Sequence, residues 1–592
     1  MSWLDGPTRF LFFTGKGGVG KTSIATATAI AMADAGKRVL LVSTDAASNL
    51  DEMLGVRLSN QAAAVPGVPG LQLINIDPDV AARDYRQRVI EQMGPLAGQT
   101  EKDAVTEQLS GACTTEIASF DEFASLLADD NPSYDHIVFD TAPSGHTLRL
   151  LSLPKAWSGF LAHNDQGASC LGPHSGLKMQ EARFNRALAT LGNSAVTTVL
   201  LVARSEAGAL AEAARTSMEL QALGLTGQRL IVNGVFHASM PDDPVARAVE
   251  AQGRAALNHM PASLQALPRD DVPLRAVDTV GLPALRSLLS GGATVSASVL
   301  PTRDALPARP FGALIDELAL QECGLIMVMG KGGVGKTTVA SALAVGLVAR
   351  GKSVHLSTTD PAAHVAGTLG EALAGLRVSR IDPKTETQLY VDKIMADKGP
   401  KLNPDERELL LEDLQSPCTE EVAVFHAFSR IVAQARRGFV VLDTAPTGHS
   451  MLLMDAAGAY HRQMLRTYEN QTGSAVNVIT PLMRLQDPGY TKIILVALPE
   501  RTPVSQAAAL QEDLRRAHIE PYAWVLNRSV WAASTQDPLL AARLHVEWEQ
   551  LKRIQEGLSA NTYIIPFQIE PPVGLRALRA LSGHPEADSA AA

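Results

Sequence analysis

The sequence is poor in cysteine. Its 592 residues include only four, at Cys113, Cys170, Cys323 and Cys418, and no two of them form a C-x-x-C pair. This spacing argues against a disulfide framework and against a paired-cysteine zinc site. We therefore expect four reduced thiols.

Long apolar runs and an excess of positive charge are also missing. No apolar stretch reaches the length of about 18 residues that a membrane-spanning helix needs, and residues 1–13 lack the pattern of a secretory leader. The 52 lysines and arginines are outnumbered by 62 aspartates and glutamates, which gives a net charge of −10. We expect a cytoplasmic protein that does not bind nucleic acid and touches a membrane only through a partner.

The sequence contains a tandem repeat. The motif GKGGVGKT occurs at residues 15–22 and again at 330–337. DTAPSGH at 140–146 is matched by DTAPTGH at 443–449, in the same order along the chain. Such self-similarity predicts two homologous halves.

The repeat also sets the expected domain boundaries. We place the first half at residues 1–291 and the second at 311–582. Residues 292–310 are small, polar and proline-bearing, which is typical of a linker. Residues 583–592 are predicted to be a flexible tail.

Short apolar runs alternate with helical stretches in each half. In the first half, the β-rich runs cover residues 9–14, 38–44, 136–139, 197–203 and 228–235. A helix is predicted over 21–35, and Gly36 ends it. Strands that are apolar throughout are buried on both faces, as in parallel sheets. The predicted fold class is α/β: two tandem, homologous, doubly wound parallel sheets that bind ligands at the carboxyl ends of their strands.

Each GKGGVGKT motif lies between a predicted strand and a predicted helix. Such a loop surrounds phosphate oxygens with backbone N–H groups, and the helix N-terminus favours negative charge. Lys21 and Lys336 are expected to reach the β- and γ-phosphates of ATP, and the Thr22 and Thr337 hydroxyls to bind Mg²⁺. The predicted ATP-binding residues of the loops are Gly15, Gly17, Gly18, Val19, Gly20, Lys21, Thr22, Ser23, Gly330, Gly332, Gly333, Val334, Gly335, Lys336, Thr337 and Thr338.

Four aspartates follow predicted strands at equivalent places in the two halves. Asp45 and Asp360 are placed to orient an attacking water or to hold a magnesium-bound water. Asp140 and Asp443 follow apolar strands as a Walker B carboxylate does, near the metal. A role as helix caps or solvated turn residues is the alternative for all four.

Two asparagines end apolar strands late in each half. Asn233 follows LIV, and Asn527 follows WVL. An amide at such a strand end can bond both the donor and the acceptor on an adenine edge, so both residues are predicted to bind ATP. A purely structural Asx turn is the alternative.

A lysine directly follows the first glycine of each loop, at Lys16 and Lys331. This lysine makes both loops resemble those of the deviant Walker ATPases, which work as face-to-face dimers. The resemblance implies that Lys16 serves the ATP site of the second half and Lys331 that of the first, each supplying positive charge as an arginine finger does. Hydrolysis would then require the two halves to close.

Cys113 and Cys418 occupy equivalent places, each three residues before a glutamate that begins an apolar helical pattern. A thiol near a helix N-terminus has a lowered pKa, and the thiolate is the form that binds metal. A buried core cysteine is the alternative, and we favour it for Cys323, which precedes an apolar strand. Cys170 lies in the polar stretch GASCLGPHSG, where a core role is less natural.

Two histidines end the DTAP motifs. His146 and His449 could link the phosphate site to whatever lies between the halves, or could simply form ordinary hydrogen bonds.

Taken together, the tandem loops, signature lysines, DTAP segments and C-T-x-E cysteines resemble the catalytic subunits of the arsenite-transporting ATPase family over nearly the full length. The resemblance implies that As(III) or Sb(III) binds soft thiolates between the halves, which suits a thiophilic metalloid. The implied ligands are Cys113, Cys170 and Cys418, with His146, His449 and Ser416 as auxiliary positions.

The resemblance also implies a mechanism and partners. Bound metalloid would draw the halves together and stimulate ATP hydrolysis, which would energise export through an arsenite membrane pump. An arsenic metallochaperone is a further expected partner. The chain itself is expected to be monomeric, with its halves related by a pseudo-twofold axis, and to attach to the inner membrane through the pump.

The main alternative is a targeting ATPase for tail-anchored membrane proteins. That class uses a zinc C-x-x-C pair and a methionine-rich groove, whereas this chain lacks the pair and scatters its 15 methionines. An iron–sulfur reductase of the nitrogenase type would need two symmetric thiolates in each half, whereas only Cys113 and Cys418 occupy equivalent positions here. Partition and septum-site ATPases bind DNA or carry a basic amphipathic tail, which the acidic composition disfavours.

Overall fold

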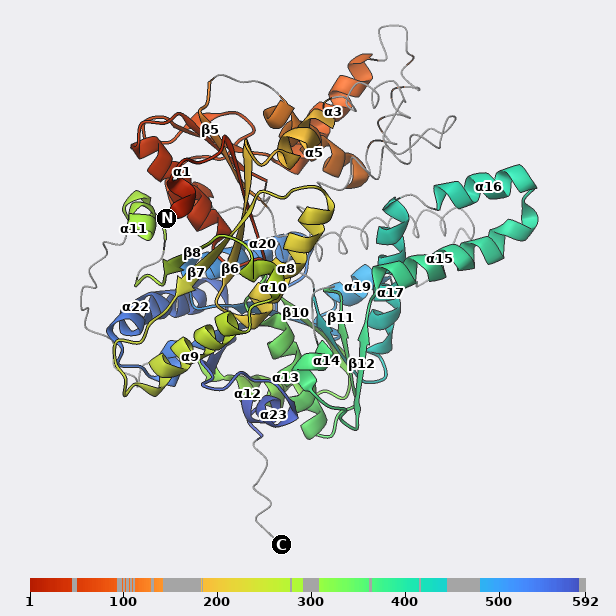
Figure 1. Ribbon diagram of the computed structural model, residues 1–592. Helices are drawn as coiled ribbons and strands as arrows, with labels where there is room; N and C mark the ends of the chain where they lie inside the picture. The colour runs from red at the N-terminus through yellow and green to blue at the C-terminus, as the bar shows by residue number, and fades with distance from the viewer. Residues whose placement is uncertain are drawn as a thin grey trace. The chain divides into compact units, whose positions relative to one another are not determined.

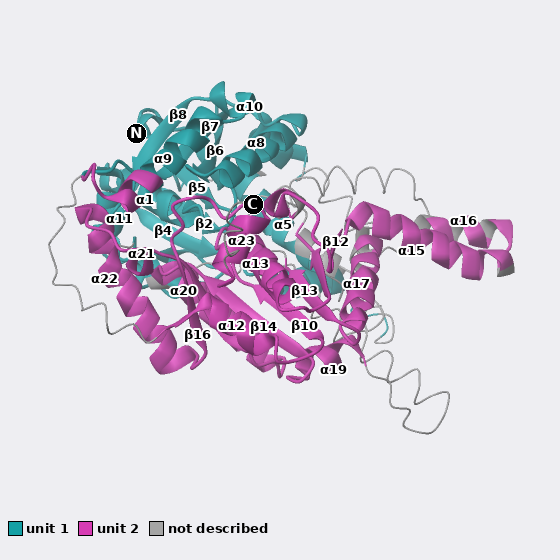
Figure 2. Ribbon diagram, turned by 90° about the horizontal axis from the view of Figure 1, so that it is seen from below, with its two compact units in different colours: residues 1–239, 249–295 teal, residues 240–248, 296–592 magenta. Residues whose placement is uncertain are grey.

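The chain forms two compact units, shown in different colours in Figure 2. They comprise Met1–Ser239 with Val249–Val295, and Met240–Ala248 with Ser296–Ala592. The computed structural model describes residues 1–44, 50–92, 98, 102, 106, 109, 112–128, 133–141, 183, 185–276, 279–290, 308–360, 365–414, 417–444 and 480–584. The domain boundaries expected from the repeat stay predictions.

The first unit contains an eight-stranded sheet of order β3-β4-β2-β5-β1-β6-β7-β8. Its strands are β1 (Phe10–Thr14), β2 (Val39–Ser43), β3 (Ala63–Ala64), β4 (Leu71–Asn75), β5 (His136–Asp140), β6 (Thr197–Arg204), β7 (Gln228–Val235) and β8 (Arg269–Pro273). Neighbours pair in parallel, except that the two-residue edge strand β3 is antiparallel to β4. The strands β1, β2 and β5 are buried at every position, as continuous apolar runs predict.

This sheet separates two hydrophobic cores, because successive side chains of a strand point to opposite faces. In β1, Leu11 and Phe13 pack with helix α1, while Phe10 and Phe12 pack with helix α5. The helices described in this part of the chain are η1 (Ser2–Leu4), α1 (Lys21–Asp34), α2 (Leu50–Leu54), α3 (Pro78–Gln92), α5 (Ala112–Ala128), α8 (Ala207–Ala222), α9 (Pro244–Asn258), α10 (Ala262–Gln265) and α11 (Leu282–Ser290). After α1 the chain turns at Gly36, with φ at 84°, which confirms the predicted helix end.

The second unit contains an eight-stranded sheet of order β12-β11-β13-β10-β14-β15-β16-β9, in which all pairs are parallel. Its strands are β9 (Arg309–Pro310), β10 (Gly324–Met329), β11 (Val354–Thr358), β12 (Leu376–Arg380), β13 (Phe439–Asp443), β14 (Thr491–Ala497), β15 (Ala523–Ser529) and β16 (Thr562–Pro566). Apart from the edge strands β3 and β9, both sheets have the same order. The predicted fold class of two tandem α/β halves is therefore confirmed, and their pseudo-twofold pairing stays a prediction.

Helices cover both faces of the second sheet (Figure 1). They are α12 (Phe311–Leu318), α13 (Lys336–Ala349), α14 (Val365–Leu369), α15 (Pro383–Lys398), η3 (Gly399–Lys401), α16 (Pro404–Asp413), α17 (Pro417–Gln434), α19 (Pro481–Gln486), α20 (Arg501–Arg516), α21 (Val530–Ala533), α22 (Pro538–Arg553), the π-helical turn η4 (Ile554–Leu558) and α23 (Leu575–Leu581). Helices α15 and α16 extend away from this sheet. Within the described residues, no helix combines the length and apolar character needed to cross a membrane.

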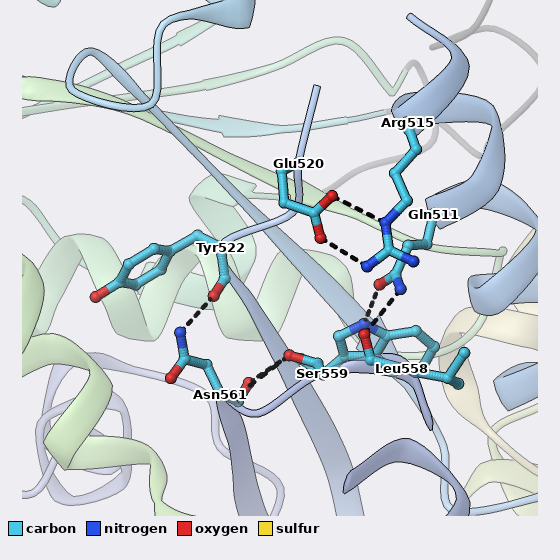
Figure 3. Close-up of polar contacts among 8 residues, drawn as sticks. Gln511, Arg515, Glu520, Tyr522, Leu558, Ser559 and Asn561 are labelled. Carbon is cyan, nitrogen blue, oxygen red and sulfur yellow. Dashed lines mark hydrogen bonds and ion pairs between the residues drawn. The ribbon is translucent and has the colours of Figure 1, made fainter. Parts of the chain in front are cut away.

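A buried glutamine joins strand β15 to the π-helical turn of the second unit (Figure 3). Gln511, on α20, is 1% exposed. Its Oε1 accepts a hydrogen bond of 2.7 Å from Trp524 Nε1, and its Nε2 donates one of 2.9 Å to the Leu558 carbonyl. Beside it, Arg515 and Glu520 form an exposed two-bond ion pair. One buried side chain thus satisfies the indole N–H of a core tryptophan and a part-buried carbonyl, whereas the ion pair is exposed to solvent.

We predict that Gln511→Leu lowers the free energy of unfolding of the second unit by about 2–5 kcal/mol. The substitution leaves the Trp524 indole N–H and the Leu558 carbonyl without a partner, and each such buried group costs about 1–3 kcal/mol. Urea unfolding followed by tryptophan fluorescence measures the change. The matched control is Arg515→Gln, which breaks the exposed pair and should cost at most about 1 kcal/mol. Equal unfolding midpoints for the two variants would show that the buried hydrogen bonds of Gln511 contribute no more to stability than the exposed ion pair does.

Candidate functional site

The first glycine of each loop passes over a neighbouring strand too closely for any side chain. Gly15 and Gly330 have φ of 148° and 149°. A Cβ at these positions would lie 2.2 Å from the carbonyl oxygen of Val202 and 2.4 Å from that of Val496, respectively. The first glycine of each motif is therefore required by backbone packing.

The last glycine of each loop caps the following helix. Gly20 and Gly335 precede α1 and α13, and both have φ of 91°. A Cβ on either would lie 2.2 Å from the side-chain Nδ2 of Asn233 or Asn527. The left-handed backbone and the asparagine together exclude any residue but glycine.

The two asparagines, which lie on strands of the sheets, form hydrogen bonds to the phosphate loops. Asn233 Nδ2, at the end of β7, donates a hydrogen bond of 2.8 Å to the Val19 carbonyl. Asn527 Nδ2, on β15, donates one of 2.9 Å to the Val334 carbonyl. The adenine contact predicted for these residues stays a prediction. It would use the amide carbonyl oxygen as an acceptor.

The loop lysines fold back onto the signature lysines of their own loops. Lys21 Nζ donates to the Lys16 carbonyl, and Lys336 Nζ to the Lys331 carbonyl, both at 3.2 Å. Lys21 and Lys336 are each 6% exposed, so a buried ammonium lies within each loop. Lys16 Nζ lies 3.9 Å from where a Cβ on Gly208, in the first turn of α8, would be. The roles predicted for Lys16 and Lys331 in the opposite halves stay predictions.

The aspartate predicted to act as a Walker B carboxylate in the second half, Asp443, contacts the first helical turn after the loop. Asp443 is 1% exposed, and its Oδ2 accepts hydrogen bonds from Thr337 Oγ1 at 2.8 Å and Thr358 Oγ1 at 3.2 Å. The pKa of Asp443 is raised to about 6, mainly because the carboxyl is buried; the Lys336 ammonium opposes this shift, and the Asp360 carboxylate adds to it. The structure thus brings four predicted site residues together, along with Thr358.

These residues fit a magnesium ion. Mg²⁺ prefers hard oxygen ligands, and the Thr337 hydroxyl and Asp443 carboxylate supply them. The Oδ1 atom of Asp443 is buried without a hydrogen-bond partner, and a divalent cation could occupy the place of that partner. When bound, Mg²⁺ would polarise the phosphate oxygens. In the first half, Asp140 occupies the equivalent end of β5 and is fully buried.

The threonines beside the aspartates have a structural role that sequence reasoning missed. Thr141 Oγ1 donates a hydrogen bond of 2.8 Å to the Phe13 carbonyl of β1, and Thr444 Oγ1 donates one of 2.9 Å to the Val328 carbonyl of β10. Each DTAP motif is therefore anchored to the strand that leads into the phosphate loop. The occurrence of DTAP in both halves was the sequence feature that could have indicated this role of the threonine.

The candidate metalloid ligands fall mostly outside the described residues. Cys113 and Cys418 are the second residues of α5 and α17, so both lie in a first helical turn, as predicted. Cys323 was expected in the core, but this prediction is wrong: the residue directly before β10 is only half-buried. The predicted site residues outside the described part of the chain are Asp45, His146, Cys170, Ser416 and His449. Within that part, no cluster of three or more His, Cys, Asp or Glu side chains is placed to hold a metal.

We predict that Gly335→Ala weakens ATP binding by the second loop about tenfold or more, which corresponds to about 1.4 kcal/mol or more. The added Cβ would collide with Asn527 Nδ2 and open the loop. Titration with a fluorescent ATP analogue measures the affinity. The matched control is Gly351→Ala, where φ is 79° but no atom lies within 4 Å of the added Cβ. This control should add backbone strain alone and leave the affinity unchanged; a similar loss in both variants would contradict the steric explanation.

Comparisons with known proteins extend over both loops. Residues 8–290 and 323–485 match the family model of the anion-transporting ATPases. An arsenical pump-driving ATPase of Escherichia coli is 48% identical over 592 residues, which cover 98% of this chain and all of the relative. One of Acidiphilium multivorum is 47% identical over 588 residues, with the same coverage. The ATPase GET3 of Kluyveromyces lactis is 31% identical over 255 residues, which cover 39% of this chain and 73% of the relative. With both phosphate loops inside the matched residues, this chain belongs to the anion-transporting ATPase family.

Proposed function

We propose that this ATPase drives the export of a trivalent metalloid, As(III) or Sb(III), through a membrane pump. Similarity to arsenical pump-driving ATPases over 98% of the chain supports the proposal. The observation that carries it is the equivalence of Cys113 and Cys418, each the second residue of its helix. Two thiols repeated in this way suit a cargo that binds sulfur from both halves.

The chemistry of these positions favours a soft, thiophilic cargo. A cysteine at a helix N-terminus has a lowered pKa, because the helix dipole stabilises the thiolate. Thiolates bind soft ions in preference to hard ones. In this proposal Cys170 completes the ligand set, and the auxiliary positions are His146, His449 and Ser416.

Hydrolysis uses the two phosphate loops. Lys21 and Lys336 hold the phosphates of ATP, and Asp45 and Asp360 orient the attacking water. The proposed magnesium ligands or their hydrogen-bonding neighbours are Thr22, Asp45, Asp140, Thr337, Asp360 and Asp443. In the second half, the bond between Thr337 and Asp443 supports this assignment.

Coupling between cargo and hydrolysis follows from closure of the halves. Metalloid bridging the cysteines would favour closure, and Lys16 and Lys331 would then each reach the ATP of the opposite half. Because linkage is reciprocal, ATP should tighten metalloid binding by the factor with which metalloid tightens ATP binding, typically about 5- to 150-fold.

The proposal also sets the partners and location. The chain would act as a monomer in the cytoplasm, attached to the inner membrane through the pump, and would receive cargo from an arsenic metallochaperone. Its net charge of −10 gives no support to a nucleic-acid partner.

We expect arsenite to stimulate steady-state ATP hydrolysis, and Cys113→Ala or Cys418→Ala to abolish most of the stimulation. Each variant removes a thiolate that bridges the halves, so metalloid no longer favours closure. The matched control is Cys323→Ala, which changes a half-buried cysteine at the start of β10 and should keep full stimulation. If arsenite changes the rate of ATP hydrolysis in neither the parent chain nor any of the three variants, the proposal of metalloid export is overturned. A targeting ATPase for tail-anchored proteins would then be favoured.

A further inference from the structure

The turn after the loop-contacting asparagine has the same length in both halves. Asp243 and Asp537, which cap α9 and α22, each stand ten positions after Asn233 and Asn527. The two turns can therefore be compared residue by residue.

The second turn carries backbone strain that the first avoids. The residue after each asparagine has a left-handed backbone: Gly234 with φ at 76° and Arg528 with φ at 61°. Both lie in β-bulges, where the register shifts next to the asparagine. Glycine adopts this conformation freely, whereas a side-chain-bearing residue does so only when surrounding contacts hold it there.

A buried carboxylate, Glu547, holds the start of the second turn, and the buried Asp243 accepts hydrogen bonds from Thr535, Gln536 and Asp537 at its end. Glu547, on α22, is 5% exposed. Its Oε2 accepts the N–H groups of Val530 at 3.1 Å and Trp531 at 3.2 Å, and its Oε1 accepts the hydroxyl of Ser529. The Ser529 oxygen in turn caps α21 by accepting the Ala532 N–H at 3.1 Å. Glu547 thus fixes three consecutive residues that begin two positions after Asn527.

Among the described residues of the first half, no glutamate occupies the position of Glu547. Gly253 stands where the second half has Glu547, ten positions after the capping aspartate. The nearest equivalent contacts come from Glu250, whose carboxylate lies 3.4 Å from the Ala238 nitrogen and 3.5 Å from His237 Nδ1. These bonds are long, and the Glu250 side chain is 29% exposed.

We propose that Glu547 is a positioning residue of the second ATP site, which holds the turn after Asn527 so that this strand end keeps its place against the phosphate loop. The inference rests on the proposed binding of adenine by Asn527. The contact that transmits the effect is the bond from Asn527 Nδ2 to the Val334 carbonyl. A loosened turn would let the asparagine and its loop move apart, and nucleotide would have to reorder both.

The environment of Glu547 makes glutamine a close substitute. Burial raises the pKa of Glu547 to about 7, although its three donors and the nearby Arg543 lower it. Arg543 is itself paired with Glu500 at 2.8 Å. Burial disfavours the ionised carboxylate, so the uncharged side chain of a glutamine suits the same position. Its oxygen can accept the backbone N–H groups, and its amino group can donate to Ser529.

The test measures the affinity of the full-length chain for a fluorescent ADP analogue in a Lys21→Ala background, which disables the first loop. We expect Glu547→Ala to weaken binding about tenfold, equivalent to about 1.4 kcal/mol. Glu547→Gln should restore the affinity to within about twofold, since its amide oxygen can accept the two backbone N–H groups and its amino group can donate to Ser529 in place of accepting from it. The matched control is Glu250→Ala in a Lys336→Ala background, which should change the affinity of the first site by less than about twofold.

The outcomes separate the inference from the function on which it rests. Unchanged affinity in a folded Glu547→Ala chain would overturn the positioning role and leave the ATPase function intact. Absence of nucleotide binding in the Lys21→Ala background with Glu547 present would contradict the assigned second site itself. A role in stability alone would lower the melting temperature and leave the affinity of the folded protein unchanged. Should Glu547→Ala fail to fold, Ser529→Ala removes the bond to Glu547 together with the cap of α21 and should weaken binding about threefold. No change in that variant would also overturn the inference.

Discussion

The hydrogen bond from an asparagine amide to a phosphate-loop carbonyl joins each ligand site to its sheet. It requires glycine at the last position of the loop, because a Cβ there would lie 2.2 Å from the amide nitrogen. It also places the C-terminal part of β7 or β15 beside the last residues of the phosphate loop, just before α1 or α13 begins. The loop geometry, the helix start and the adjoining strand end therefore depend on one contact in each half.

Buried charge is concentrated around these loops. The ammonium groups of Lys21 and Lys336 lie inside them, and Asp443 lies at the end of β13 with a pKa raised to about 6. Burying charged groups costs free energy, and perturbed buried charges are often found where a protein binds a charged ligand. A magnesium nucleotide carries charges of both signs: its negative phosphates would pair with the lysines, and its Mg²⁺ ion would pair with the carboxylate.

The two halves keep the same sheet order and loop contacts but differ around the second strand end. Arg528 replaces Gly234, and Glu547 replaces Gly253. These changes are coupled in physical terms, because a strained left-handed residue needs contacts that hold it. Family membership follows from features that the halves share, whereas differences in nucleotide affinity between them would arise at positions that have diverged.

The sequence by itself determined the repeat, the parallel α/β class and both phosphate loops, because strand periodicity, helix ends and glycine-rich turns are local properties of the chain. It also placed Cys113 and Cys418 in first helical turns. The tertiary structure alone decided what Asn527 contacts, that Thr337 bonds Asp443, and that Glu547 faces the turn after β15. The first two contacts join residues 193 and 106 positions apart, so no local pattern could indicate them. Glu547 looked like any charged residue on an amphipathic helix, and only the packing of α22 against the strand end buried its carboxylate.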